Sequence, residues 1–237
     1  MEYNFRSQLE SLIFIQGEVE HINQSVPWLE EEEQSTIDAM KSPRILKTHD
    51  KWSWVPKGDC VRYIYCIRNP KDVCCSYYNH MSEVFIEHYN YQGTLNEFYH
   101  DVFIKPGKSE QGWYFDHLRD WLDQKGNPNI HFLFFEDMVE DLKREIQKLI
   151  GFLNVECSKD KLDRIVQSSK FDSMTTNNAV NYSWRNGSFK DSNSKFLKSG
   201  KVGTWTNYLS EVQSDEICKL AKELIEIPYG FKFRYIL

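Results

Sequence analysis

No stretch of this 237-residue chain approaches the ~20 consecutive apolar residues that a membrane-spanning helix needs. The residues after Met1 lack the basic and apolar regions of a signal peptide. None of the six cysteines forms a CxxC pair, and the seven histidines show no metal-ligand spacing. A net charge of −6 provides no global basic field for nucleic acid. The sequence therefore predicts a reduced, cytoplasmic protein with no metal, no membrane and no nucleic-acid partner.

The composition shows no break along the chain. It is 41% hydrophobic and 27% charged, which is ordinary for a globular protein, so we expect one domain over residues 1–237. The aromatic share of 15% is high. Aromatic side chains enrich a core, but they also line pockets for flat ligands, and composition leaves both interpretations open.

Apolar and β-branched runs alternate with amphipathic stretches. Strands are expected at 43–49, 61–67 and 130–135. Helices are expected at 6–16, 70–81, 111–124, 138–153, 158–168 and 211–226, with an acidic helix start at 30–33 and a mobile Asn- and Ser-rich loop at 175–195. Strands separated by helices imply parallel pairing, so the fold class is α/β, a central parallel sheet flanked by helices.

Ligands of such folds collect where the strands end, and His49, Arg68 and Glu136 all follow predicted strands. Arg68 also precedes a helix start, where free N–H groups and positive potential favour a phosphate. Ser76, two turns further on, reaches the same anion if the ligand lies along that helix. The alternative is that Arg68 pairs with Asp72 on the surface and Ser76 packs.

Four segments carry a resemblance to a known family: RILKTH at 44–49, VRYIYCIRNPKDVCCSYY at 61–78, IHFLFFED at 130–137 and FLKSGKVGTW at 196–205. In order and spacing they resemble the signature blocks of cytosolic sulfotransferases. The resemblance implies a P-loop-like α/β fold and 3′-phosphoadenylyl sulfate as the donor. It also implies transfer of a sulfuryl group to the hydroxyl of a small molecule, a phenol or an alcohol, without a metal.

Two positions match catalytic residues of that family. His49 matches the general base that takes the acceptor's proton, and an imidazole, with a usual pKa near ~6.5, suits that role. Lys47 matches a lysine at the reacting centre, where a cation offsets developing charge. Without the resemblance, a lone histidine after a strand is more often structural.

The resemblance also implies a donor site. Arg68 and Ser76 match the 3′-phosphate contacts, and Phe171 matches a ring that stacks on adenine. Phe135 stands where the family has tyrosine, and Ser199 replaces a cation of the family's Arg-Lys-Gly clamp. The full set of implied donor-binding residues is Arg68, Ser76, Phe135, Ser169, Phe171, Lys198, Ser199 and Gly200.

Two departures qualify these expectations. The family's phosphosulfate-binding loop, Pro-Lys-Ser-Gly-Thr-Thr-Trp, has no counterpart here, so we expect a domain that lacks its first strand and loop. This leaves two interpretations, an active sulfotransferase that continues upstream or a truncated, non-catalytic module that binds a nucleotide or a partner. The family's dimer motif falls at 206–215, where Glu211 replaces its valine. The motif is therefore degenerate, although a homodimer is possible.

Overall fold

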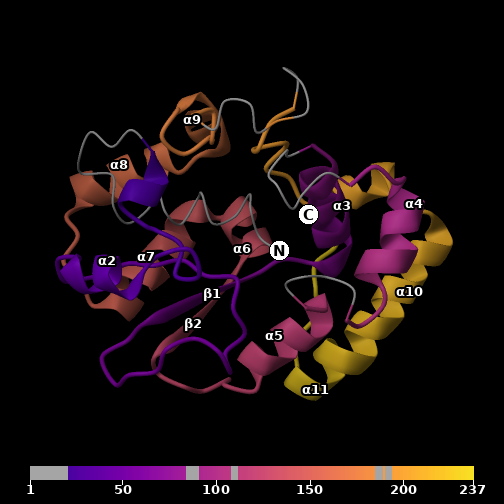
Figure 1. The fold of residues 1–237 in the computed structure, drawn as a ribbon, viewed down its shortest axis with the longest axis horizontal. Helices are drawn as coiled ribbons and strands as arrows, with labels where there is room; N and C mark the ends of the chain where they lie inside the picture. Colours follow the sequence, from indigo (N-terminus) through magenta and orange to yellow (C-terminus); the bar gives the residue numbers. More distant parts are fainter. Residues whose placement is uncertain (1–20, 84–90, 108–111, 185–188, 190–193) are drawn as a thin grey trace.

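The computed structural model has a parallel pair of strands at its centre, β1 (Tyr63–Ile67) and β2 (Ile130–Phe134) (Figure 1). In their register Tyr63 lies beside Ile130 and Ile67 beside Phe134. This confirms the two strands predicted from apolar and aromatic runs, and the α/β class. The structure describes residues 21–83, 91–107, 112–184, 189 and 194–237, so the helix expected at 6–16 lies outside the described residues.

The strand predicted at 43–49 is wrong in extent. Only an isolated parallel bridge forms there, between Trp28 and Lys47. The backbone of Lys47 donates to Pro27 O at 3.1 Å and accepts from Leu29 N at 2.8 Å. The pairing does not extend into a ladder, because Pro27 has no N–H to donate on one side and His49 N donates to Glu30 Oε1 on the other.

The helices follow the predicted order with several changes. Asn69 accepts from Asp72 N at 2.9 Å and so caps the helix that starts at Pro70, as predicted. The helices are α2 (Gln34–Ala39), α3 (Pro70–Glu83), α4 (Leu95–Phe98), α5 (Tyr114–Leu122), α6 (Phe135–Glu140), α7 (Leu142–Leu153), α8 (Lys159–Ser168), α9 (Phe171–Thr176), α10 (Glu211–Ala221) and α11 (Ile227–Tyr229), with short turns η1 (Ile22–Gln24), η2 (Tyr99–Phe103), η3 (Thr204–Asn207) and η4 (Lys222–Glu226).

Two predicted helices are each divided, and the first part of one predicted loop has regular hydrogen bonding. The stretch 138–153 breaks at Asp141, whose side chain leaves the helical run to cap α7 through Arg144 N at 3.0 Å. The stretch 211–226 is α10 followed by a π-helical turn. The first part of the loop expected at 175–195 belongs to α9 and to a hydrogen-bonded turn, because asparagine side chains there bind the backbone.

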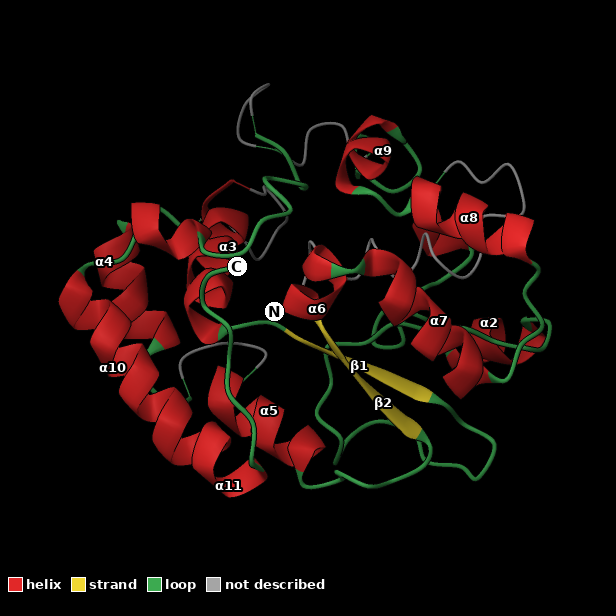
Figure 2. Ribbon diagram, turned by 180° about the vertical axis from the view of Figure 1, so that it is seen from behind, coloured by secondary structure: helices red, strands yellow, loops and turns green. Residues whose placement is uncertain are grey.

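The two faces of the sheet pack against different helices (Figure 2). Ile64 and Cys66 of β1 face α7 and α8, whereas Tyr65 and Ile67 face α3, α5 and α10. This is the period-two alternation of a strand covered on both sides. A third cluster joins Ile22 and Val26 to Met174 of α9 and to Val180, Tyr182 and Leu197.

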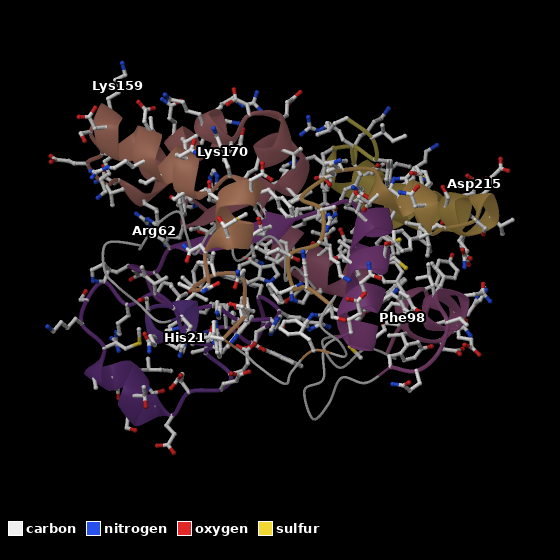
Figure 3. The ribbon with its side chains drawn as sticks, turned by 90° about the horizontal axis from the view of Figure 1, so that it is seen from above. His21, Arg62, Phe98, Lys159, Lys170 and Asp215 are labelled. Carbon is white, nitrogen blue, oxygen red and sulfur yellow. The ribbon has the colours of Figure 1, made fainter. Side chains whose placement is uncertain are left out.

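Seen from above, the side chains show which positions are interior (Figure 3). Phe98 of α4 is fully buried, and its ring meets those of Tyr77 and Tyr78 on α3 edge to face. Lys159 and Asp215 extend outward from the molecule. No helix within the described ranges is long and apolar enough to cross a bilayer.

Candidate functional site

His49 lies just beyond the Trp28–Lys47 bridge and is held by a carboxylate. Its Nδ1 lies 2.7 Å from Glu30 Oε1, and its backbone N–H donates to the same oxygen at 2.9 Å. Since a carboxylate accepts, Nδ1 carries the proton in this contact and Nε2 is the basic nitrogen. The imidazole stacks on Trp28 with ring centroids 4.2 Å apart. Glu30 and Trp28 therefore fix both the tautomer and the plane of the ring.

Lys47 lies in the same short segment, and only 6% of it is exposed. Its Nζ donates to Asn23 Oδ1 at 2.7 Å and to the Tyr182 hydroxyl at 3.2 Å. The ammonium also lies over the Trp28 ring, 4.5 Å from its centroid. A cation–π interaction and hydrogen bonds to two neutral oxygens therefore surround this buried side chain.

The backbone of His49 is fixed from the sheet side. His117 of α5 donates from Nε2 to His49 O at 2.9 Å, because a carbonyl can only accept. The other ring nitrogen, Nδ1, therefore accepts from the Tyr65 hydroxyl of β1 at 2.8 Å. This connects the sheet to the segment that carries Lys47 and His49.

Arg68 directly follows β1 and is buried, with 7% exposure. Its guanidinium lies 4.4 Å from the centre of the Phe135 ring and donates to Lys201 O at 3.3 Å. The nearest oxygen of Asp72 is 3.9 Å away. The alternative, in which Arg68 pairs with Asp72 on the surface, is therefore wrong about the surface location, because both residues are buried.

Asp72 joins the start of α3 to the segment near residue 203. Its Oδ2 accepts from Asn69 Nδ2 at 2.8 Å and from Gly203 N at 2.9 Å. Its Oδ1 accepts from Thr204 Oγ1 and Trp205 N, both at 3.0 Å. One buried carboxylate thus holds the end of the 196–205 block against the helix N-terminus.

Glu136, the third of the residues that follow predicted strands, binds Asn69. Its Oε1 accepts from Asn69 N at 2.8 Å and from Asn69 Nδ2 at 2.9 Å. Burial raises the pKa of the Glu136 carboxyl, and the hydrogen bonds from Asn69 partly oppose that rise.

Gly200 and Phe171 are brought into direct contact. Gly200 has a φ of +62°, and a Cβ placed there would lie 2.4 Å from Cδ2 of Phe171. Glycine is therefore required both by the backbone conformation and by the close approach. Phe171 starts α9, and Ser169, fully buried, ends α8 just before it.

The remaining predicted residues lie along α3 and its neighbouring segment. Lys198 forms an ion pair with Glu83, the last residue of α3. Ser76, half-buried, lies seven residues before Glu83, which places both on one side of the helix. Ser199, also half-buried, stands between Lys198 and Gly200.

The predicted residues fall into two groups, a Lys47–His49 group and a group around Arg68, Phe171 and Gly200. Tyr182 connects them, since its hydroxyl meets Lys47 and its ring lies 4.1 Å from that of Phe196. Glu30 and Tyr182 were not predicted as site residues. Glu30 belongs to an acidic run that is typical of a solvated helix start, and no local pattern singles out Tyr182.

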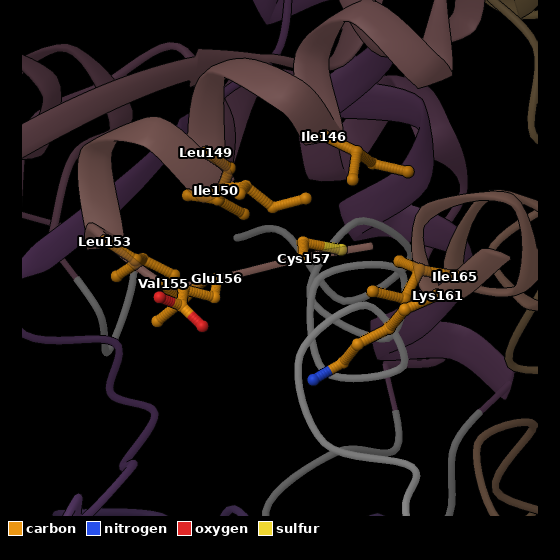
Figure 4. A pocket seen from close by; sticks show the side chains of 9 residues that line it. All are labelled: Ile146, Leu149, Ile150, Leu153, Val155, Glu156, Cys157, Lys161 and Ile165. Atoms are coloured by element: carbon orange, nitrogen blue, oxygen red, sulfur yellow. The ribbon is translucent and has the colours of Figure 1, made fainter. Parts of the chain in front are cut away.

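A small cavity of about 60 Å³ lies elsewhere, between α7 and α8 (Figure 4). Its lining is mainly aliphatic, with Glu156, Cys157 and Lys161 as the other side chains, and it contains no predicted site residue. Among the residues that the structure describes, no three His, Cys, Asp or Glu side chains are grouped to hold a metal ion.

The chain is similar in sequence to known proteins. The family model described as "Sulfotransferase domain" matches residues 7–227. Sulfotransferase 1C2 of Rattus norvegicus is 34% identical over 215 residues, which are 86% of this chain and 70% of that protein. Sulfotransferase 1E1 of Mus musculus is 32% identical over 221 residues, 86% of this chain and 73% of that protein.

Among solved structures, retinol dehydratase in complex with retinol and PAP superposes with a TM-score of 0.74 at 28% identity. The superposition covers 85% of this chain and 58% of the retinol dehydratase chain. The present chain therefore spans less than two thirds of that protein.

Proposed function

The chain belongs to the sulfotransferase family, and on that basis we propose that it transfers a sulfuryl group from 3′-phosphoadenylyl sulfate to the hydroxyl of a small molecule. The observation that carries this proposal is the pairing of Glu30 with the imidazole of His49, two residues from the buried ammonium of Lys47. A base and a cation in one short segment suit the removal of a hydroxyl proton and the stabilisation of negative charge.

His49 takes the proton of the acceptor hydroxyl at Nε2, while Glu30 stabilises the imidazolium through Nδ1–H. Lys47 supplies positive charge near the reacting oxygen. When bound, 3′-phosphoadenylyl sulfate would supply the sulfuryl group: the acceptor oxygen would bond to sulfur, the bond between sulfur and the 5′-phosphate oxygen would break, and 3′,5′-diphosphoadenosine would leave. The retinol dehydratase structure holds PAP, which supports the same class of donor for this chain.

The residues expected at the donor site fit an adenosine phosphate. Arg68 contributes a buried positive charge, and the nearby Asp72 carboxylate already accepts hydrogen bonds from the 203–205 segment. The close approach of Gly200 to Phe171 brings a backbone that can face a phosphate next to a ring that can face a base. We assign Arg68 to the 3′-phosphate and Phe171 to the adenine. The remaining donor contacts are assigned to Ser76, Phe135, Ser169, Lys198, Ser199 and Gly200.

The test is transfer of labelled sulfate from 3′-phosphoadenylyl sulfate to a panel of phenols and alcohols. His49→Ala should lower kcat/KM by about 10²–10⁴-fold, the usual contribution of a general base. Its affinity for 3′,5′-diphosphoadenosine should stay within twofold of the wild type, because His49 lies in the Lys47 group.

His100→Ala, at an exposed histidine of η2, is the matched control and should leave transfer unchanged. Transfer that survives His49→Ala would refute the assigned base. Nucleotide binding without any transfer by the wild type would instead support the non-catalytic module that the sequence leaves open.

A further inference from the structure

Tyr182 has an unusual backbone conformation. Its φ is +62°, and among the described non-glycine residues only Asn154 shares a positive φ. Asn154 ends a helix, where asparagine adopts this conformation readily. A bulky aromatic residue does not, so the surroundings of Tyr182 must hold it there, and such positions cluster at functional sites.

An asparagine-rich turn provides that support. Val180 N and Asn181 N both donate to Asn177 O, at 3.1 and 3.0 Å. The side chain of Asn181 accepts from Ser183 N at 2.9 Å and donates to Thr175 O at 3.0 Å, so it bridges the residues on either side of Tyr182. The strained conformation is therefore built into the turn.

The result is a buried tyrosine, 5% exposed, that contacts Lys47. Its hydroxyl oxygen accepts from Lys47 Nζ at 3.2 Å, and the ammonium lies 5.7 Å from the centre of its ring. Asn23 accepts from the same ammonium at 2.7 Å. Two neutral oxygens thus fix the direction in which the lysine side chain extends.

The other side of Tyr182 contacts the segment that carries Lys198 and Gly200. Its ring packs on Phe196, with centroids 4.1 Å apart and planes tilted by 32°. Phe196 precedes Lys198 by two residues, and Gly200 at the end of the segment lies on Phe171. A shift of Phe196, at the start of this segment, would therefore press directly on the ring of Tyr182.

We propose that Tyr182 is a positioning residue. Its hydroxyl orients Lys47, and its ring couples the position of residues 196–200 to the position of that lysine. The catalytic meaning of this link rests on the proposed function, but the link itself is a property of the folded chain. It predicts that nucleotide binding at Arg68 and Gly200 changes the environment of Lys47.

The experiment observes the Lys47 ammonium by NMR in ¹⁵N-lysine-labelled full-length protein, with Lys47→Arg to identify the signal. In the wild type, 3′,5′-diphosphoadenosine should shift this signal. Tyr182→Phe keeps the ring but removes the hydroxyl, so it should displace the signal before nucleotide is added and at least halve the response. The affinity for the nucleotide should stay within twofold.

Phe196→Leu separates the two parts of the proposal. It keeps the hydroxyl on Lys47, so the starting signal should match the wild type, while the response to the nucleotide should fall at least twofold. Tyr208→Phe removes a hydroxyl from an exposed tyrosine and serves as the control, with no expected effect.

Transfer assays give a second measurement. Tyr182→Phe should lower kcat about tenfold with little change in KM for the donor. A Lys47 signal and response in Tyr182→Phe identical to the wild type would overturn the proposal. If the wild type neither binds the nucleotide nor transfers sulfate, the proposed function fails, whereas displacement of the Lys47 signal by Tyr182→Phe still supports the positioning contact.

Discussion

At the scale of single residues, the position of Gly200 requires a glycine. Replacing it by alanine would place a methyl group 2.4 Å from the Phe171 ring and force an alanine to φ +62°. The conformation alone costs about 1–2 kcal/mol, and the ring must also move. We expect Gly200→Ala to weaken binding of 3′,5′-diphosphoadenosine at least tenfold, measured by titration calorimetry.

Gly230→Ala is the matched control for this substitution. Gly230 has a similar φ of +70°, but a Cβ there would meet no atom within 4 Å. It should therefore lose a similar amount of backbone stability and keep its nucleotide affinity. Equal affinity losses in both variants would show that the contact between Gly200 and Phe171 is irrelevant to binding.

His49, Lys47 and Arg68 could be predicted from the sequence because they follow expected strands and match the family motifs. Glu30 and Tyr182 could not. Glu30 reaches His49 from 19 residues away, and Tyr182 reaches Lys47 from 135 residues away. Such contacts depend on tertiary packing, and nothing in a local window of sequence reports them.

At the scale of elements, the hydrogen bonds of Asp72 join α3 to residues 203–205. Asp72→Ala would leave Gly203 N and Trp205 N without their acceptor and remove the carboxylate beside Arg68. Breaking a buried, hydrogen-bonded charge in this way costs about 3–5 kcal/mol. Urea unfolding of Asp72→Ala should show a loss of free energy of that size.

Asp38→Ala tests whether loss of any aspartate has this effect. Asp38 forms a surface ion pair with Arg44, and both side chains are largely exposed. Exposed pairs contribute about 0–1 kcal/mol, so this variant should unfold nearly as the wild type does. A loss for Asp72→Ala no larger than for Asp38→Ala would contradict the role given to the junction.

The predictability of the elements follows from the same local rules. The strands at 61–67 and 130–135 were predicted within two residues because long apolar runs suit a doubly covered sheet. The strand at 43–49 was over-predicted because its partner segment contains Pro27. The break at Asp141 and the ordered turn at 177–183 were missed because asparagine and aspartate side chains bind backbone there instead of solvent.

At the scale of the whole molecule, Glu136 links stability to pH. Burial holds its pKa above the ordinary value of 4.5 in the folded protein. The unfolded chain releases this proton at the ordinary pKa, so the folded state binds it more tightly. The resulting stabilisation is fully present below pH 4.5 and is lost as the pH rises through the higher, folded-state pKa.

Glu136→Gln isolates this contribution, because glutamine can still accept from Asn69 and does not titrate. The free energy of unfolding of the wild type minus that of the variant should fall as the pH rises above 4.5. Denaturant unfolding at a series of pH values measures the difference. A difference that is flat, or that grows with pH, would show that the carboxylate is well stabilised in its ionised form.

The hydrogen bonds of Asp72 also constrain the order of folding. Its partners Gly203, Thr204 and Trp205 lie 131 to 133 residues away in sequence. Closing a loop of this length costs conformational entropy, and contacts between residues so far apart in sequence form slowly. The contacts of Asp72 with residues 203–205 are therefore expected to form after local structure such as α3, and a chain without them would lack the segment proposed to hold the nucleotide.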